Sequence, residues 1–197
     1  MTSTKPSRRE QSHERILDAA ARAVRRSGVA GVGVAEVMKE AGLTHGGFYA
    51  HFESRDALLT EALEHAGGQS IARLRERMRV RTDAGESPLR ALVCEYLSEP
   101  HMEAVEFGCP VAAIASEMPR APAALLEVAR SRVRGLAALV ETALPSGLSA
   151  GSALVIASSL VGALQMARVL GPEDAGVVLK ACSEALLAQY DRPAAAG

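Results

Sequence analysis

A cluster of aromatic and histidine side chains lies in the first third of the chain. The sequence contains three Phe, three Tyr and no Trp, and three of these aromatic residues, Phe48, Tyr49 and Phe52, stand beside His45 and His51. Phe48 and Phe52 are four residues apart, so on a helix both would face the core. His45, Tyr49 and His51 are then left for the outer face, where hydroxyl and imidazole groups can bind a polar partner.

Cys109 is a second residue with possible chemistry. It stands in the Phe-Gly-Cys-Pro sequence at 107–110, and the proline suits the first position of a helix, which places Cys109 at or near the N-cap. The helix dipole and unpaired N–H groups stabilise a thiolate there, so Cys109 could react with oxidants or electrophiles. The alternative is an unreactive residue lining a pocket. Cys94 and Cys182 lie on apolar helical stripes and are expected in the core.

An enzyme, either a thiol peroxidase that uses Cys109 or a small helical transferase, is the alternative function. However, no Ser-His-Asp arrangement, phosphate loop or paired carboxylates stand out, and the glutamates near His101 form no known metal pattern. The three cysteines are odd in number and include no CxxC pair, which argues against a disulfide framework or structural zinc. We therefore expect no catalytic residue, metal or cofactor.

The elements that must position the aromatic cluster are two short helices joined by a tight turn. The first helix is predicted by apolar residues at helical spacing, which are Val34, Val37, Met38 and Ala41. Gly42 ends this helix, because glycine takes the left-handed conformation that a sharp C-terminal turn requires. Leu43 is the buried residue of the turn, and Thr44 is expected to cap the second helix. This pattern indicates a helix-turn-helix, whose second helix lies in the DNA major groove.

The segment resembles the DNA-binding domain of the TetR family of bacterial regulators. The matching residues are Gly42-Leu43-Thr44, Tyr49-Ala50-His51-Phe52 and Ser54-Arg55-Asp56-Ala57-Leu58. The resemblance covers residue 8 to about residue 66. The sequence departs from the family pattern at Gly33, Met38 and Gly46-Gly47. These departures suggest that the DNA-binding motif is less rigid, since each interior glycine costs a helix about 1 kcal/mol relative to alanine.

The resemblance implies a sequence-specific transcriptional regulator, most simply a repressor. Thr44 and His45, at the tip of the second helix, are the candidates for contacts with base edges, and Gly46 and Gly47 would allow close backbone approach. Three further residues, Tyr49, His51 and Arg55, are candidates for phosphate contacts, which position the protein without reading sequence. The alternative for each is a solvated surface side chain.

Composition and charge agree with a helical DNA-binding protein. The 197-residue chain is 48% hydrophobic and 3% aromatic, which favours an all-α fold. Residues 1–26 carry a net charge of +4 and the remainder carry −5, so the positive charge lies at the helix-turn-helix end. We expect a three-helix DNA-binding domain at 1–54 and a helical ligand-sensing and dimerisation domain at 55–197. Ser54 is expected to cap a helix from residue 55 to about 81, and a Gly67-Gly68 pair inside it is interpreted as a flexible joint. Ser87 is expected to cap the next helix, and residues 101–108 are expected to form a loop before Pro110 opens another helix.

Residues 142–167 carry no charge and are long enough to cross a bilayer. Pro145, Gly147, Gly151 and five serines interrupt them, which favours a buried core helix over a membrane span. The polar N-terminus shows no secretory signal, so a cytoplasmic protein is expected.

The two C-terminal helices are predicted at about 149–170 and 173–190. Their charge-poor faces, which include Val161 and Leu186, suggest a homodimer. In the family such helices form a four-helix bundle between protomers; the alternative is that both are internal core helices. The family also holds an inducer among its middle helices. The corresponding residues here are mostly aliphatic and suit a small apolar ligand or an ordinary core. The sensing candidates are Cys109, Tyr96, Phe107 and Met118, and ligand binding or modification of Cys109 would release the protein from a palindromic operator.

Overall fold

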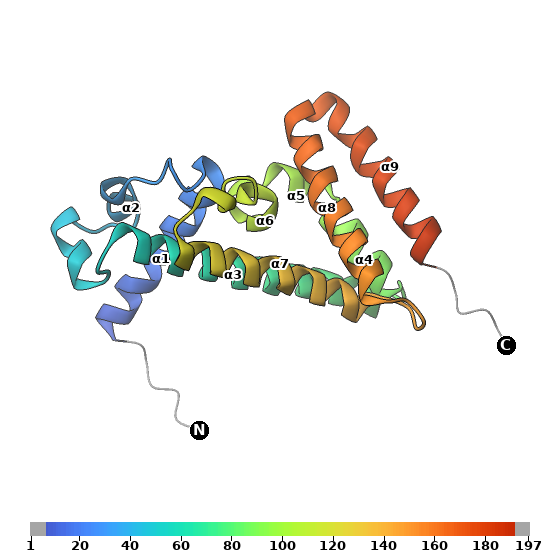
Figure 1. Ribbon diagram of the computed structural model, residues 1–197, viewed down its shortest axis with the longest axis horizontal. Helices are drawn as coiled ribbons and strands as arrows, with labels where there is room; N and C mark the ends of the chain where they lie inside the picture. Colours follow the sequence, from blue (N-terminus) through green and yellow to red (C-terminus); the bar gives the residue numbers. More distant parts are fainter. Residues whose placement is uncertain (1–6, 192–197) are drawn as a thin grey trace, which may run out of the picture.

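The computed structural model describes residues 7–191, and this part of the chain contains helices and loops but no strand. An N-terminal head is built from α1 (Arg8–Ser27), α2 (Val34–Glu40) and the 3-10 helix η1 (His45–Ala50). Two long helices, α3 (Arg55–Asp83) and α7 (Ala123–Ala143), run side by side and connect the head to a helical body (Figure 1). At the far end of the body, α8 (Ala150–Leu170) packs against α9 (Pro172–Tyr190). The predicted all-α fold is confirmed.

The head has its own apolar core. Ser7 and Glu10 form a capping box that begins α1, with the Ser7 N–H donating to Glu10 Oε2 over 2.7 Å. Phe48 and Phe52 are both buried, as their spacing predicts, and their rings stack with centroids 5.8 Å apart. Gly42 has a φ of +71°, which confirms the left-handed turn that ends α2.

The second helix of the motif differs from the expectation. It is a 3-10 helix rather than an α-helix, and the Thr44 hydroxyl caps no N–H group, although Thr44 does occupy the N-cap position. The adjacent glycines, Gly46 and Gly47, have low helix propensity, and six residues form too few hydrogen bonds to offset it. A backbone bond from the Gly47 N–H to the Thr44 carbonyl, 3.0 Å long, supports this turn instead.

Helix α3 belongs to both halves of the molecule. Ser54 caps it by accepting a bond from the Ala57 N–H over 3.1 Å, and it continues without a break through Gly67 and Gly68. Its first turns, with Leu58 and Leu63, pack in the head core, whereas Met78 packs in the body core. A division of the chain after residue 54 remains a prediction, because the head core includes side chains that follow it.

The middle of the chain is more helical than expected. Residues 101–108, expected to form a loop, include the end of α5 (Glu99–Glu103) and the short helix η2 (Val105–Phe107). They follow α4 (Pro88–Tyr96) and lead into α6 (Pro110–Ile114), η3 (Met118–Arg120) and α7. Serines or prolines begin these helices as predicted: Ser87 caps α4 and Pro110 opens α6.

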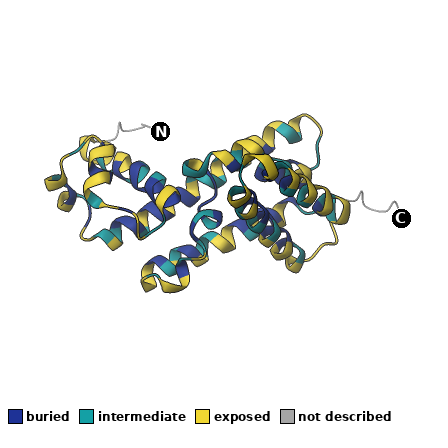
Figure 2. Cartoon of the chain, turned by 90° about the horizontal axis from the view of Figure 1, so that it is seen from above, coloured by how far each residue is buried: buried dark blue, intermediate teal, exposed yellow. Residues whose placement is uncertain are grey.

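Helix α8 is, among the described residues, the one helix long and apolar enough to cross a membrane, by length and composition only. A single such helix is weak evidence, because core helices pass the same test. Ile156, Leu160 and Leu164 are buried in the body core, whereas Met166 and Val169 are exposed. Figure 2 shows this alternation of buried and exposed residues along the body helices.

A DNA-binding head and two adjoining cavities

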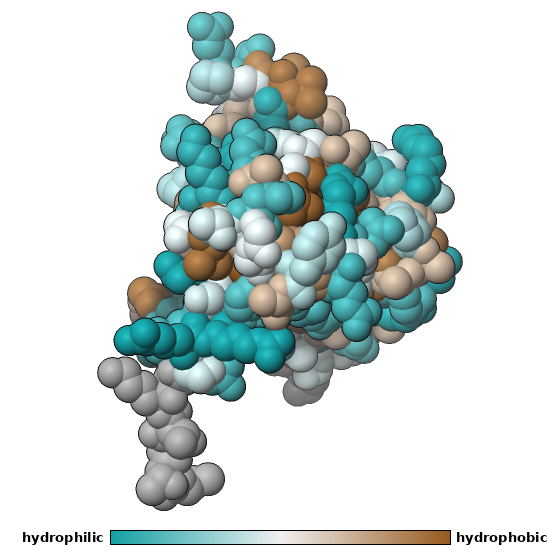
Figure 3. Space-filling model, turned by 90° about the vertical axis from the view of Figure 1, so that its left-hand side faces the viewer, coloured by the Kyte–Doolittle hydropathy of each residue, from teal (hydrophilic) through white to brown (hydrophobic). Residues whose placement is uncertain are grey.

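The tip of the head presents the predicted base-contacting residues to solvent. Thr44, His45 and Gly46 are exposed, and Tyr49 is 75% exposed while its ring meets Phe48 edge-on, with centroids 5.2 Å apart. Burial of Phe48 therefore anchors the tip and leaves Tyr49 on its surface. Figure 3 looks at this end of the molecule and shows a predominantly hydrophilic face.

The two glycines of the tip are not required by the packing of the head. A Cβ atom at Gly46 would meet nothing within 4 Å, and one at Gly47 would make only ordinary contacts with Met38 and Thr44 at 3.7 and 3.8 Å. Neither glycine has a positive φ. Open space outside them is compatible with the close approach of another molecule, which is the role predicted from the sequence.

His51 is less available than the sequence suggested. It is half-buried, its ring lies 5.9 Å from that of His13, and its Nδ1 atom is buried without a hydrogen-bond partner among the described residues. Burial, followed by the nearby His13, lowers the pKa of His51 below its usual value of 6.5. At neutral pH the imidazole is therefore uncharged, which weakens the case for an ionic phosphate contact.

Arg55 has a structural role that the sequence did not reveal. Its Nε–H donates to the Val32 carbonyl over 3.0 Å, and its Nη2 donates to the carbonyls of Val29 and Ala30. The guanidinium thus holds the loop between α1 and α2 against the start of α3. These bonds use Nε and Nη2 and leave Nη1 for another acceptor, so a phosphate contact by Arg55 stays a prediction.

Arg25 joins the head to the body and was placed on the polar face of its helix by sequence alone. Its side chain is buried, and it donates from Nη2 to the Ala66 carbonyl over 2.7 Å and from Nη1 to the Glu106 carbonyl over 2.8 Å. Burial is the main cause that lowers its pKa to about 10, so it stays charged at neutral pH. Arg25 therefore links α1, α3 and η2. Nothing in the sequence around Arg25 indicates that its partners lie so far along the chain.

Cys109 is buried, contrary to the expectation of an accessible loop thiol. It is 6% exposed, whereas Cys94 and Cys182, expected in the core, are both partly exposed. Two hydrogen bonds fix the backbone around Cys109 against the rest of the protein. Arg73 donates to the Phe107 carbonyl over 3.0 Å, and the Cys109 N–H donates to His101 Nε2 over 3.0 Å. All three cysteines are free thiols.

His101 and Tyr96 complete the surroundings of Cys109. His101 Nδ1 donates to the Tyr96 carbonyl over 2.7 Å, and Nε2 accepts from Cys109, so the ring is neutral with its proton on Nδ1. Burial lowers the pKa of His101 to about 4. The Tyr96 side chain is 1% exposed, and its hydroxyl lies near the Cys109 thiol without forming a hydrogen bond of ordinary geometry to residues 7–191. Burial, with Cys109 as a smaller cause, raises the pKa of Tyr96 well above its usual value of 10.

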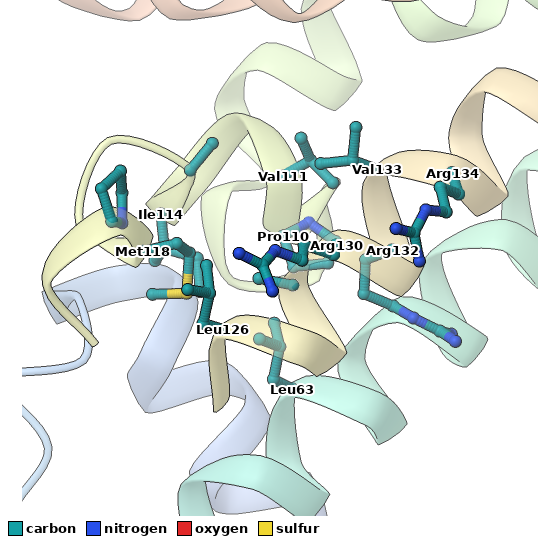
Figure 4. A pocket seen from close by; sticks show the side chains of 13 residues that line it. Leu63, Pro110, Val111, Ile114, Met118, Leu126, Arg130, Arg132, Val133 and Arg134 are labelled. Carbon is teal, nitrogen blue, oxygen red and sulfur yellow. The ribbon is translucent and has the colours of Figure 1, made fainter. Parts of the chain in front are cut away.

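Two cavities adjoin this region and share Pro110, Val111, Arg132 and Arg134 in their walls. The first, of about 360 Å³, is lined mainly by apolar side chains, including Met118. Figure 4 shows Ile114, Met118 and Leu126 towards one end of it and Arg132 and Arg134 towards the other. The second, of about 550 Å³, is lined by residues that include Tyr96, Cys109, Gly67, Gly68 and Gly135.

The four sensing candidates are thus only partly brought together. Cys109 and Tyr96 line the second cavity, whereas Met118 lines the first. Phe107 is half-exposed under the guanidinium of Arg73 and lines a small separate pocket of about 50 Å³, to which Tyr96 also contributes. Sequence reasoning missed Arg132, which borders both larger cavities. Among the described residues no group of three His, Cys, Asp or Glu side chains could hold a metal ion.

Residues 16–62 match the family model described as bacterial regulatory proteins, tetR family. The chain is also 34% identical over 65 residues to an uncharacterized HTH-type transcriptional regulator, YerO, of Bacillus subtilis (strain 168). That alignment covers 33% of this chain and 22% of YerO, so the chain spans about a fifth of this relative's length.

Solved structures resemble nearly the whole chain. Escherichia coli NemR in its reduced form has a TM-score of 0.74 at 22% identity, covering 93% of this chain and 99% of NemR. A TetR transcriptional regulator from Chloroflexus aurantiacus J-10-FL has a TM-score of 0.73 at 27% identity, with 91% and 94% covered. The multidrug binding protein EbrR, complexed with imidazole, has a TM-score of 0.64 at 26% identity, with 98% and 100% covered.

Proposed function

Because this chain belongs to the TetR family of bacterial regulatory proteins, we propose that it is a transcriptional regulator that binds a palindromic operator as a homodimer. The observation that carries the proposal is the helix-turn-helix with an exposed tip at Thr44, His45 and Gly46. One tip reads few base pairs, so a two-fold dimer that reads two half-sites is the geometry that gives specificity. Repression is the simpler mode, because a protein that covers an operator blocks transcription without further contacts.

Exposed apolar side chains on α8 and α9 support the dimer. Val155, Met166 and Val169 are exposed on α8, and Val177 is exposed on α9. Several large apolar side chains exposed on one helix pair are costly to leave in water and are typical of a surface that a partner covers. We propose a second copy of the chain as this partner, with the two helix pairs packed face to face.

The cavities beside Cys109 support control by a small molecule. Volumes of about 360 and 550 Å³ lie in the range of ligand pockets, and both cavities touch α3 and α7, which lead to the head. We propose that a ligand bound there releases the protein from DNA. The multidrug-binding relative EbrR shows that a protein of this fold can bind small molecules.

Modification of Cys109 is the second proposed route of release. Cys109 is 6% exposed and lines the second cavity. A small electrophile would therefore have to enter the cavity, and Cys109→Ser should keep the protein on DNA at doses that release the wild type. The known similarities are to regulators and not to enzymes, so the alternative of a thiol-dependent redox enzyme has no support.

The direct test measures binding to a fluorescent duplex taken from upstream of the gene that encodes the chain. We expect affinity to fall steeply with salt, because Lys and Arg contacts displace counterions from phosphates. Tyr49→Phe should weaken binding to all duplexes by the same factor without changing the salt dependence, since the hydroxyl carries no charge. Tyr190→Phe, at the far end of α9, is the matched control. Salt-independent binding, or no binding, would contradict the proposal.

A further inference from the structure

The side chains that line the two cavities include positive charges and no negative charges. Their lining includes four arginines, Arg75, Arg130, Arg132 and Arg134, and no Asp or Glu. Two glutamates form ion pairs with them from positions that do not line either cavity: Glu64 with Arg132 at 3.0 Å and Glu127 with Arg130 and Arg134 at 3.1 and 3.5 Å. Arg75 forms no ion pair with the described residues. The region therefore keeps an excess of positive charge.

Arg132 lines both cavities. Its side chain crosses α3 at Gly67, where an added Cβ atom would lie 2.1 Å from Arg132 Cδ. The absence of a side chain at Gly67 thus makes room for the stem of Arg132. Its Nε atom is buried with no hydrogen-bond partner among residues 7–191, although Nη2 bonds to Glu64 and Ser131. A buried N–H group of a cation without an acceptor is costly unless something else binds it.

Further unfilled space and an unused donor lie in the second cavity. Gly68 on α3 and Gly135 on α7 both line it, and a Cβ atom at either would meet nothing within 4 Å. Glycine weakens a helix interior, and here no neighbouring atom requires it. Tyr96 lines the same cavity, and its buried hydroxyl lies near the Cys109 thiol without forming a hydrogen bond of ordinary geometry to residues 7–191. The cavity therefore offers space, a neutral hydrogen-bonding group and, at Arg132, a cation.

We propose that these cavities bind an amphipathic organic anion, an apolar molecule with a carboxylate end, whose charged group binds Arg132. This inference rests on the proposed function, because it names the class of the ligand that controls release from DNA. The apolar part lies among the side chains shown in Figure 4, such as Ile114, Met118 and Leu126. A carboxylate fits the planar donor geometry of a guanidinium, whereas a cation would be repelled and a neutral molecule without an acceptor oxygen would leave the Nε–H of Arg132 unpaired.

The test compares three ten-carbon probes that differ only in their polar end: decanoate, decanol and decyltrimethylammonium. Each is titrated into the full chain below its micelle concentration, with binding followed by calorimetry and DNA release followed by anisotropy. We expect decanoate to bind at least about tenfold more tightly than decanol, and the cation to bind weakest. Equal binding of the three, tightest binding of the cation, or no binding of decanoate by folded protein would overturn the proposal.

Two variants locate the site. Arg132→Gln should reduce decanoate affinity to the level of decanol and leave decanol unchanged, whereas Ala115→Leu should narrow the first cavity, where the alkyl chain lies, and weaken both. Arg79→Gln, which changes an exposed arginine of α3 that pairs with Glu76 and Asp83, is the control and should bind as the wild type does. Unchanged decanoate affinity in Arg132→Gln would contradict the role of Arg132. Loss of DNA binding in unliganded wild type would instead contradict the proposed function, so the two failures are distinguishable.

Discussion

The positions of some individual residues could be predicted from the sequence, and the contacts of others could not. Gly42, Phe48 and Phe52 could be placed from the sequence, because a turn glycine and a spacing of four residues have local physical causes. Arg25 and Arg55 could not, because their carbonyl acceptors lie 23 to 81 residues away along the chain. A charged side chain near a DNA-binding motif suggests DNA, but its donors can equally serve the protein's own backbone.

Arg55 is expected to stabilise the head. Arg55→Ala removes its bonds to the carbonyls of Val32, Val29 and Ala30, which should lower the free energy of unfolding in urea by about 2 kcal/mol. Arg79→Ala is the control, since exposed ion pairs contribute about 0 to 1 kcal/mol. An Arg55→Ala protein of wild-type stability that binds DNA less tightly would restore Arg55 as a phosphate contact.

His101 should make stability depend on pH. Its pKa is about 4 in the folded state, below the ordinary 6.5, so the unfolded chain takes up the proton first. The stability that neutral His101 contributes is present above pH 6.5 and is lost as pH falls towards 4, by at most about 3 kcal/mol. Urea unfolding of wild type and His101→Gln at several pH values measures this. If both lose stability equally over that range, His101 is not the cause.

At the scale of elements, helix ends were more predictable than helix types. Ser54, Ser87 and Pro110 begin helices as expected, because capping depends on adjacent residues. The 3-10 form of η1 and the short helices within 101–108 were not predicted. The form of η1 follows from its own glycines, whereas the backbone of 101–108 is held by distant groups, such as Arg25 on the Glu106 carbonyl. The long helix α3 continues through its glycine pair, so the proposed flexible joint there stays a prediction.

The two glycines of α3 should respond differently to alanine. Gly68→Ala adds a Cβ atom in open space and should raise the free energy of unfolding by about 1 kcal/mol. Gly67→Ala brings a Cβ atom within 2.1 Å of Arg132 Cδ, so Arg132 must move and the gain should be lost. Urea unfolding of both variants is the measurement. Equal stabilisation would show that Arg132 does not depend on Gly67, and unchanged release from DNA in both would argue against a joint.

At the scale of the molecule, an exposed apolar surface and two cavities lie at a distance from the DNA-binding tip. Composition predicted the all-α class, and the resemblance predicted a helix-turn-helix head followed by a helical body. The sequence could not separate residues that face a partner from residues that face the core. Val161, one of the residues expected at the dimer surface, is half-buried and packs against the protomer's own core, and Leu186 is buried there.

Met166 is therefore a better site than Val161 for testing dimerisation. Met166→Arg adds a charge to an exposed position of α8, so the protomer should stay folded while the dimer, whose apolar surface would bury that charge, dissociates. Val80→Arg, a similar change at a 58% exposed position of α3, should remain dimeric. Sedimentation velocity distinguishes the states. A dimer of Met166→Arg as stable as the wild type would place the interface elsewhere.

Selection of bound sequences from a random duplex pool tests the central claim, that the head at Thr44–Tyr49 reads DNA as part of a dimer. We expect the wild-type protein to enrich a palindrome whose two half-sites are related by two-fold symmetry. His45→Ala should relax the preference at one position of each half-site, whereas Tyr49→Phe should leave the selected sequence unchanged. Folded wild-type protein that enriches no sequence over the starting pool, or that enriches a single site without symmetry, would contradict the account.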